Sequence, residues 1–337
     1  MKTSKWFLLF LAVCLVFSLA ACGGGGGSDD PFGGGNGGGG SPVVNTTPLT
    51  FTALAAGSTV STTNQGGTVA NTPSLEYSTD GENWEPFTLN TGDDATNTKI
   101  ILANVGDKVY LRATGTNDSF SADDGYIKFT MTGSIAASGN IMSLLDKTCT
   151  SKVIPSNHCF TYLFRNCSQL SSAPELPAVT LSAHCYNSMF LGCTGLTTAP
   201  ELPATTMAED CYAYMFSGCS ALLTVPSSLP AATLAEGCYY AMFDGCSSLT
   251  TAPALPATTL AEDCYAYMFY GCSSLSSITV HFATWSDIYT DHWVEGVAPS
   301  GEFHCRVGLN TGTNSIDRVP VGWTDGHIHM DVPEPAP

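Results

Sequence analysis

One unit of sequence occurs five times between residues 159 and 282, with starts separated by 26, 26, 27 and 26 residues. Each copy begins with a cysteine and an aromatic residue and continues through Met or Leu, Phe and Gly or Asn to a second cysteine. A fixed period in this range is typical of a solenoid, in which each repeat buries its apolar face against its neighbours. The first cysteines are Cys159, Cys185, Cys211, Cys238 and Cys264, and the second are Cys167, Cys193, Cys219, Cys246 and Cys272.

The spacing of apolar residues predicts about three turns of helix in each copy. In the last copy, Thr259 and Glu262 have the spacing of a capping box, and Gly271 lies where a helix ends on a left-handed residue. Cys264 and Met268 continue an apolar stripe at every fourth position. The equivalent residues are expected to stack as ladders of Met189, Met215, Met242, Met268 and of Phe190, Phe216, Phe243, Phe269.

A short strand is expected after each of these glycines, because Ser274 to Val280 alternates between polar and apolar residues. Pro200, Pro226 and Pro253 occupy this strand in the inner copies, so only brief ladder pairing is expected there.

The run Phe-x-Gly-Cys-x-x-Leu followed by a Pro-bearing strand resembles the BspA-type leucine-rich repeats of bacterial surface proteins, over roughly residues 141–282. The strand differs from the family pattern, since Ala199, Val225 and Ala252 stand where Ile or Val is usual. The resemblance implies a ligand-binding or adhesin-like surface protein without catalytic residues.

The repeat cysteines are expected to be buried reduced thiols, with disulfides between the second cysteines of neighbouring copies as the alternative. Cys264 and Cys272 lie eight positions apart, about 12 Å along a helix, which is too far for a bridge. This spacing also differs from that of zinc knuckles, so no metal site is expected.

Residues 48–138 contain no cysteine and show short alternating runs separated by Gly, Asn and Asp. This pattern predicts an immunoglobulin-like all-β sandwich, with a hairpin at Asp80-Gly81 and Trp84 packed in its core. Asp93, Asp94, Asp123 and Asp124 are interpreted as loop carboxylates, because they lack the alternating spacing of a calcium loop. The predicted fold class is therefore α+β, with this sandwich before a leucine-rich-repeat solenoid at residues 139–283.

The N-terminus predicts an exported, lipid-anchored chain. Residues 1–21 have the two lysines, apolar run and small residues of a signal peptide, and Leu19 to Cys22 resembles the lipobox of bacterial lipoproteins. The resemblance implies cleavage before Cys22 and acylation of that residue. Residues 22–47 are rich in glycine and are expected to form a flexible tether. The acidic pair Asp29-Asp30 resembles an export tag for the outer face of the outer membrane.

Residues 284–337 are expected to cap the repeats and to end in an acidic, Pro-rich tail. His327, His329 and Asp331 alternate as on one strand face and could ligate a metal, but a solvated tail is the preferred interpretation.

The formal charge of −18 and the absence of a basic run argue against nucleic-acid binding. No catalytic motif or cofactor motif is present, so we expect a non-enzymatic protein that binds a protein or glycan outside the cell. The positions that vary between copies are the candidate binding surface, namely Tyr214, Tyr267, Tyr270 and Asp244. The alternative is a carbohydrate-binding accessory lipoprotein, in which either the β domain or an aromatic patch stacks on sugar rings, with Tyr212 and Tyr265 joining these tyrosines in the patch.

Overall fold

Alternating buried and exposed side chains build the strands that precede residue 139. The computed structural model describes residues 46–66, 72–89, 97–122, 125–323 and 325–333. In β8, for example, Ile127, Phe129 and Met131 face the core and the residues between them are more exposed. The strands are β1 (Leu49–Ala53), β2 (Ser58–Gly66), β3 (Leu75–Ser78), β4 (Glu85–Phe87), β5 (Ile100–Leu102), β6 (Lys108–Ala113), β7 (Ser121–Ala122), β8 (Gly125–Thr132) and β9 (Ile135–Ser138).

These strands form two sheets, one of order β10-β9-β1-β6-β3-β4 and one of order β5-β2-β8-β7. The first sheet crosses into the repeats, because β10 (Leu170–Ser172) pairs in parallel with β9. The aromatic rings follow the same path: Phe51 contacts Phe129 at 5.1 Å and Phe164 of the first copy at 6.2 Å between centroids. A 3₁₀-helix, η1 (Ile141–Leu144), lies between β9 and the repeats with all its residues buried. The hydrophobic core is therefore continuous from the sheets into the repeats.

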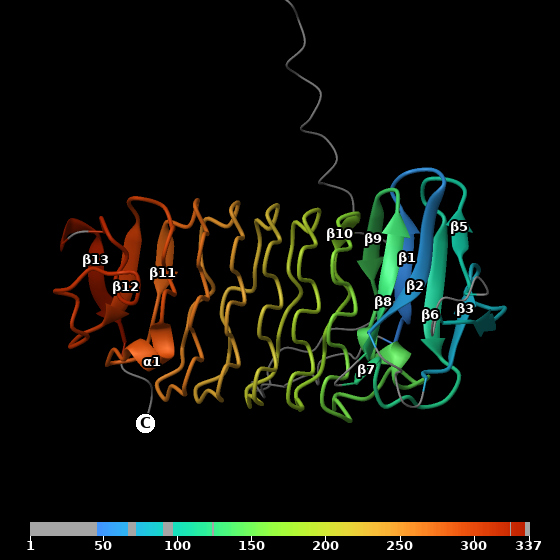
Figure 1. Ribbon diagram of the computed structural model, residues 1–337, viewed down its shortest axis with the longest axis horizontal. Coiled ribbons are helices and arrows are strands. Elements are labelled where there is room, and N and C mark those ends of the chain that lie inside the picture. Colours follow the sequence, from blue (N-terminus) through green and yellow to red (C-terminus); the bar gives the residue numbers. More distant parts are fainter. Residues whose placement is uncertain (1–45, 67–71, 90–96, 123–124, 324, 334–337) are drawn as a thin grey trace, which may run out of the picture. The chain divides into compact units, whose positions relative to one another are not determined.

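The predicted α+β fold, with a leucine-rich-repeat solenoid of one strand and one helix per repeat after an immunoglobulin-like sandwich, is wrong. Within the described ranges the one α-helix is α1 (Asp287–Thr290), which has four residues and lies beyond the repeats. The segments expected to be helical are runs of turns. Figure 1 shows the copies as successive non-helical coils lying side by side.

Each coil turns at every fourth residue through a left-handed backbone conformation. In the last copy the φ angles of Asp263, Tyr267 and Gly271 are 54°, 56° and 68°. The amide N–H of Tyr267 donates to the carbonyl of Asp291 in the next segment, whereas that of Met268 donates three residues back, to Tyr265. Alternate amides along the run repeat these two choices. Many of the backbone N–H groups thus form their hydrogen bonds with the neighbouring coil, whereas in an α-helix they would bond to carbonyls of the same helix.

The predicted helix caps have a different role in the structure. Thr233 forms parallel bridges with Thr206 and Thr259, so this column of threonines links neighbouring coils. The strand expected after each glycine is reduced in the inner copies to isolated bridges such as the pair Thr198 and Thr224.

Aromatic ladders run through the middle of the coils. Phe216 stacks between Phe190 and Phe243 at 5.6 Å on each side, with the rings nearly parallel. A second ladder passes through Tyr212 and Tyr239, whose centroids are 5.9 Å apart. The methionine ladder is fully buried, at Met189, Met215, Met242 and Met268.

The cysteines fill the remaining core volume as free thiols. All twelve described cysteines are buried and unpaired with one another. The thiol of Cys219 donates to the carbonyl of Phe190 in the preceding copy, with the sulfur and oxygen 3.2 Å apart. The second cysteines of the other copies make the same contact, except that Cys167 of the first copy donates to Phe129 of β8. Burial raises the pKa of Cys219 to about 12, which disfavours the reactive thiolate. These residues therefore act as small core side chains with one weak donor.

The C-terminal segment continues the coils. β11 (Ser277–Thr279), β12 (Glu302–Arg306) and β13 (Ile328–Val332) pair in parallel, with η2 (Asp325–His327) just before β13. The solvated tail expected at residues 327–331 is therefore a paired strand up to Val332. Trp293 is fully buried and its carbonyl accepts a hydrogen bond from Phe269 of the last copy.

Trp84 does not pack in the core as predicted. It is partly exposed, and the guanidinium of Arg112 lies 3.5 Å from the ring centroid. The hairpin beside it is formed as expected, with β3 and β4 antiparallel and Asp80 accepting from the amides of Glu82 and Asn83.

The predicted signal peptide, Cys22 and the predicted tether as far as residue 45 lie outside the described residues, as do the four loop aspartates. Thr47, at the end of the predicted tether, accepts a hydrogen bond from the amide of Asn140 at its carbonyl. Within the described ranges no helix has the length and apolar character needed to span a bilayer.

Candidate functional site

A groove lined by four tyrosines lies on the later coils. Tyr214, Tyr240, Tyr267 and Tyr270 line it together with Ala241, Asp244, His292 and Glu295, around a volume of about 500 Å³. The four residues predicted as the binding surface, Tyr214, Asp244, Tyr267 and Tyr270, are all in this set. The structure thus brings together residues that are up to 56 positions apart in the sequence.

The left-handed turns place two of these tyrosines. Tyr214 and Tyr267 occupy equivalent left-handed positions, with φ of 55° and 56°. Tyr214 is 37% exposed, although Ala213 and Met215 on either side are buried. The turn thus presents one side chain outward between two that pack in the core.

Tyr240 was missed by the sequence analysis. It occupies the column of Ala213 and Ala266, which are both buried and appeared to belong to the core. A bulky tyrosine replacing alanine in one copy was the available signal, because a side chain of that size does not fit a column built for a methyl group. In the structure Tyr240 is partly exposed and lies between Tyr214 and Tyr267.

The tyrosine rings form a tilted row. The centroids of Tyr214 and Tyr240 are 5.2 Å apart and those of Tyr240 and Tyr267 are 5.6 Å apart, with interplanar angles of 59° and 44°. Tyr270 lies 5.9 Å from Tyr267 at 48°. His292 stacks on Tyr267 at 5.2 Å and 3°, so one face of that ring is covered. Ring faces and edges therefore converge on the groove at several angles, without forming one flat platform.

Carboxylates border the rings. Asp244 accepts a hydrogen bond from the hydroxyl of Ser217 at 3.1 Å, and burial raises the pKa of Asp244 above its ordinary value. Asp291 hydrogen-bonds the ring of His292 at 2.7 Å, and this bond raises the pKa of His292. Burial, followed by the charge of Asp291, raises the pKa of Tyr267. The groove thus combines aromatic rings with the carboxylates of Asp244 and Glu295 and the imidazole of His292.

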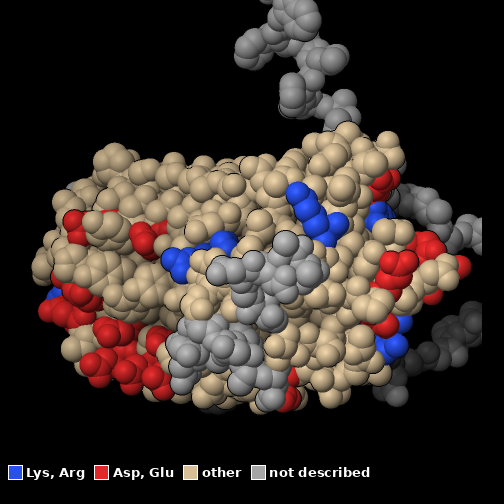
Figure 2. Space-filling view, turned by 45° about the vertical axis from the view of Figure 1, so that its right-hand side comes forward, with Lys and Arg blue, Asp and Glu red and all other residues tan. Residues whose placement is uncertain are grey.

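The repeats and the segment that directly follows them are rich in carboxylates, and the arginines nearest to the groove residues in the sequence, Arg306 and Arg318, come after this stretch. Between residues 166 and 305 the sequence has twelve Asp and Glu residues and no Lys or Arg. Figure 2 shows acidic side chains gathered at its lower left, toward the end of the view where the later coils lie in Figure 1. Such a surface attracts positively charged groups and repels anions.

Tyr212 and Tyr265, which the carbohydrate hypothesis placed on the surface, are each only 1% exposed. They belong to the inner tyrosine ladder, so their assignment to a sugar-binding face is wrong.

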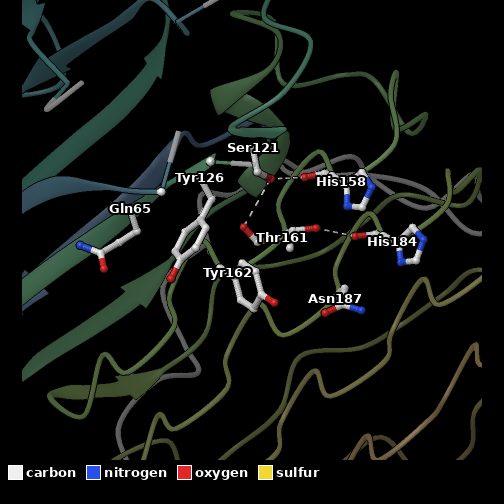
Figure 3. Close-up of a pocket in the computed structure, with 10 residues that line it drawn as sticks. Gln65, Ser121, Tyr126, His158, Thr161, Tyr162, His184 and Asn187 are labelled. Atoms are coloured by element: carbon white, nitrogen blue, oxygen red, sulfur yellow. Dashed lines mark hydrogen bonds between the residues drawn. The ribbon is translucent and has the colours of Figure 1, made fainter. Parts of the chain in front are cut away.

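A second hollow lies where the first coils meet the four-stranded sheet (Figure 3). It has a volume of about 290 Å³ and is lined by Ser121, Tyr126, His158, Tyr162, His184 and other polar residues. The rings of His158 and His184 stack with centroids 4.5 Å apart, and those of Tyr126 and Tyr162 lie at the same distance but are tilted by 45°.

The hydroxyl groups of Ser121 and Thr161 in this hollow donate to the backbone. Ser121 donates to the carbonyl of His158, and Thr161 donates to the carbonyl of His184 at 2.7 Å (Figure 3). Both hydroxyls donate to backbone carbonyls, whereas a nucleophile activated by a histidine base donates to an imidazole nitrogen. The bond of Ser121 joins β7 to the start of the first copy, and that of Thr161 joins the first copy to the start of the second.

Imidazole and carboxylate groups also meet in clusters whose ligand atoms lie within 4.8 Å of one another: His184 with Glu209 and Asp210, and Asp291 with His292 and Asp317. Their donor atoms are of the kind that holds a divalent cation. Near the C-terminus, Glu302 instead bridges His327 and His329 at 2.8 and 2.6 Å, and these bonds lower the pKa of Glu302.

Comparisons of this chain with known protein families, with curated proteins and with solved structures find no match.

Proposed function

We propose that this protein is a non-enzymatic, lipid-anchored protein of the bacterial cell surface that binds a macromolecular partner through the tyrosine groove. The groove carries the proposal. It gathers four tyrosines and two carboxylates from three successive coils and the C-terminal segment. Tyrosine is enriched at binding interfaces because its ring offers a large contact area while its hydroxyl still hydrogen-bonds.

The contrast between the core and the groove supports this function. The aromatic residues of the ladders are fully buried, whereas Tyr214 and Tyr270 are 37% and 40% exposed. Exposed tyrosines are not needed for stacking the coils, since copies with Ser188 or Ala241 at the same position as Tyr214 form the same turn. A role outside the fold accounts for their presence.

Export and lipid attachment complete the proposal. Leu19-Ala20-Ala21-Cys22 supports cleavage and acylation at Cys22, and the glycine-rich stretch that follows supports a tether between the bilayer and residues 48–337. Metabolic labelling with a fatty acid, lost in Cys22→Ser, tests this part.

Binding of the full-length chain, purified in neutral detergent, to immobilised matrix proteins and mucin tests the groove. We expect Tyr214→Ala and Tyr270→Ala each to weaken binding by about fivefold or more. Leu223→Ala is the matched control, because Leu223 is an exposed apolar residue of the same coils outside the groove. Equal binding by all three variants and the parent would refute the groove as the binding surface.

A glycan partner remains the alternative outcome of the same test. Tyrosines beside carboxylates also occur where sugars bind, since rings stack on sugar faces and carboxylates accept hydroxyl hydrogen bonds. Tyrosine-dependent capture of a neutral oligosaccharide, with no capture of protein, would replace the protein partner by a sugar.

A further inference from the structure

We infer that the tyrosine groove recognises positively charged side chains, and that its partner therefore presents a basic segment of lysine or arginine residues. This inference rests on the proposed function and specifies the chemistry of the partner. Three observations support it: the tilt of the rings, the carboxylates beside them and the absence of Lys and Arg from residues 166–305.

The ring geometry favours a cation over a sugar. A sugar ring stacks best on one open, flat aromatic face, but neighbouring tyrosines here are tilted by 59°, 44° and 48° and His292 covers one face of Tyr267. A cation has no such requirement, because it is attracted by the electron-rich face of each ring it approaches within about 6 Å. A tilted row of rings along one groove therefore suits a cation better than a sugar.

Carboxylates in the groove supply negative charge for binding a cation. Asp244 and Glu295 line the groove itself. Asp291 is hydrogen-bonded to His292, and these two groups offset each other when the imidazole is protonated. Glu295 also lies 3.8 Å from Nε2 of His292, so a protonated imidazole offsets part of its charge as well. Asp244, whose hydrogen-bond partner is the hydroxyl of Ser217, is therefore the main carboxylate for an incoming ammonium or guanidinium group, and Glu295 adds to it when His292 is neutral.

The negative charge of the coils favours a basic partner beyond the groove as well. Residues 166–305 carry twelve carboxylates and no Lys or Arg, so the long-range attraction of this stretch for a basic segment has the same sign as the contacts with Asp244 and Glu295. An acidic segment would be repelled by the same surface. The groove volume of about 500 Å³ gives room for more than one side chain.

The test uses a short peptide of alternating glycine and lysine, and the same peptide with every lysine side chain acetylated, which keeps the shape and removes the charge. Calorimetry on the full-length chain at a fixed salt concentration and at mildly alkaline pH, where His292 is less protonated, measures both affinities. We expect acetylation to weaken binding by about tenfold or more.

Variants locate the binding. Tyr270→Ala should lower the affinity for the lysine peptide by about twofold to fivefold, which is the contribution of one exposed ring. Asp244→Asn should lower this affinity by about threefold or more. Glu201→Gln removes the same charge from an exposed site outside the groove and should change affinity by less than about twofold.

Equal binding of the two peptides, or an effect of Glu201→Gln as large as that of Asp244→Asn, would overturn the inference. Binding of a choline headgroup with no binding of the lysine peptide would also overturn the protein partner, although the groove would still be a cation site. If a captured partner depends on Tyr214 and Tyr270 but the lysine peptide neither binds nor competes, the inference fails and the proposed function stands. If the peptide binds the groove but no partner is captured, the proposed function fails alone.

Discussion

Replacing Asp263 by alanine and by glycine distinguishes the turn observed there from the helix that its sequence predicts. The variant with the larger free energy of unfolding should be glycine in the turn and alanine in the helix. Asp263 is only partly buried and has φ of 54°, in the left-handed region where a Cβ atom is strained. The equivalent residue of the preceding copy is Gly237, with φ of 55°, so the coil already accepts glycine here. The comparison is between Asp263→Ala and Asp263→Gly, which both remove the carboxylate and differ by one methyl group.

The structure predicts that the glycine variant is the more stable of the two. Left-handed geometry costs a residue with a Cβ atom about 1–2 kcal/mol. Glycine loses about 0.4–1 kcal/mol through the larger entropy of its unfolded chain. The difference leaves glycine ahead by about 0.5–1 kcal/mol. In a helix, alanine would be ahead by about 0.8–1 kcal/mol, so the two structures differ in the sign of the effect.

Urea unfolding of both variants, compared at equal m-values, measures this difference. The same pair of substitutions at Glu262 is the control, because that residue is exposed and has no positive φ. Alanine should be the more stable residue there, by about 0.5–1 kcal/mol. An alanine advantage at both positions would refute the left-handed turn.

Two further predictions concern the core and the groove. Phe216→Ala should lower the free energy of unfolding by about 3–5 kcal/mol, because Phe216 is fully buried between Phe190 and Phe243; a loss below about 1 kcal/mol would contradict the ladder. Burial raises the folded-state pKa of Asp244 above 3.8, so its stabilising contribution is present below its unfolded pKa and is lost as pH rises through the folded pKa. Asparagine has no carboxyl group to titrate, so the free energy of unfolding of Asp244→Asn should rise relative to that of the parent as the pH is raised from acidic to neutral. Chemical unfolding measures both values, and a difference that stays constant over this pH range would contradict the burial of the Asp244 carboxylate.

The opposite effects expected for Asp244→Asn on stability and on binding have one cause. A carboxylate that is partly removed from water is less stable in its charged form, yet that charge also has fewer water molecules to displace when a cation arrives. A gain in stability together with a loss of peptide binding would therefore identify Asp244 as a residue of the binding surface.

The cysteines show how far spacing alone could be interpreted. The five copies each repeat two cysteines, and the sequence left reduced thiols and inter-repeat disulfides as alternatives. The structure places the second thiol of each copy against a phenylalanine carbonyl of the neighbouring copy or, for Cys167, of β8. This contact depends on the distance between coils, which no local pattern contains.

The sequence by itself determined the repeat period, the inward columns of Met, Phe and Cys, and most of the strands before residue 139. It also separated the core columns from those that vary between copies, and four of the varying residues now line one groove. These features follow from local alternation and from side-chain type, which are properties of short stretches of chain.

Only the tertiary structure decided how each coil is built. A helix and a run of four-residue turns place Cys264, Met268 and Cys272 on one side equally well, so the apolar spacing could not distinguish them. The choice depends on where the amides donate, and alternate amides reach carbonyls about 25 residues away in the neighbouring coil. Tyr240 and the continuation of the coils through β13 were hidden for the same reason, because both are set by contacts between coils that the local pattern does not encode.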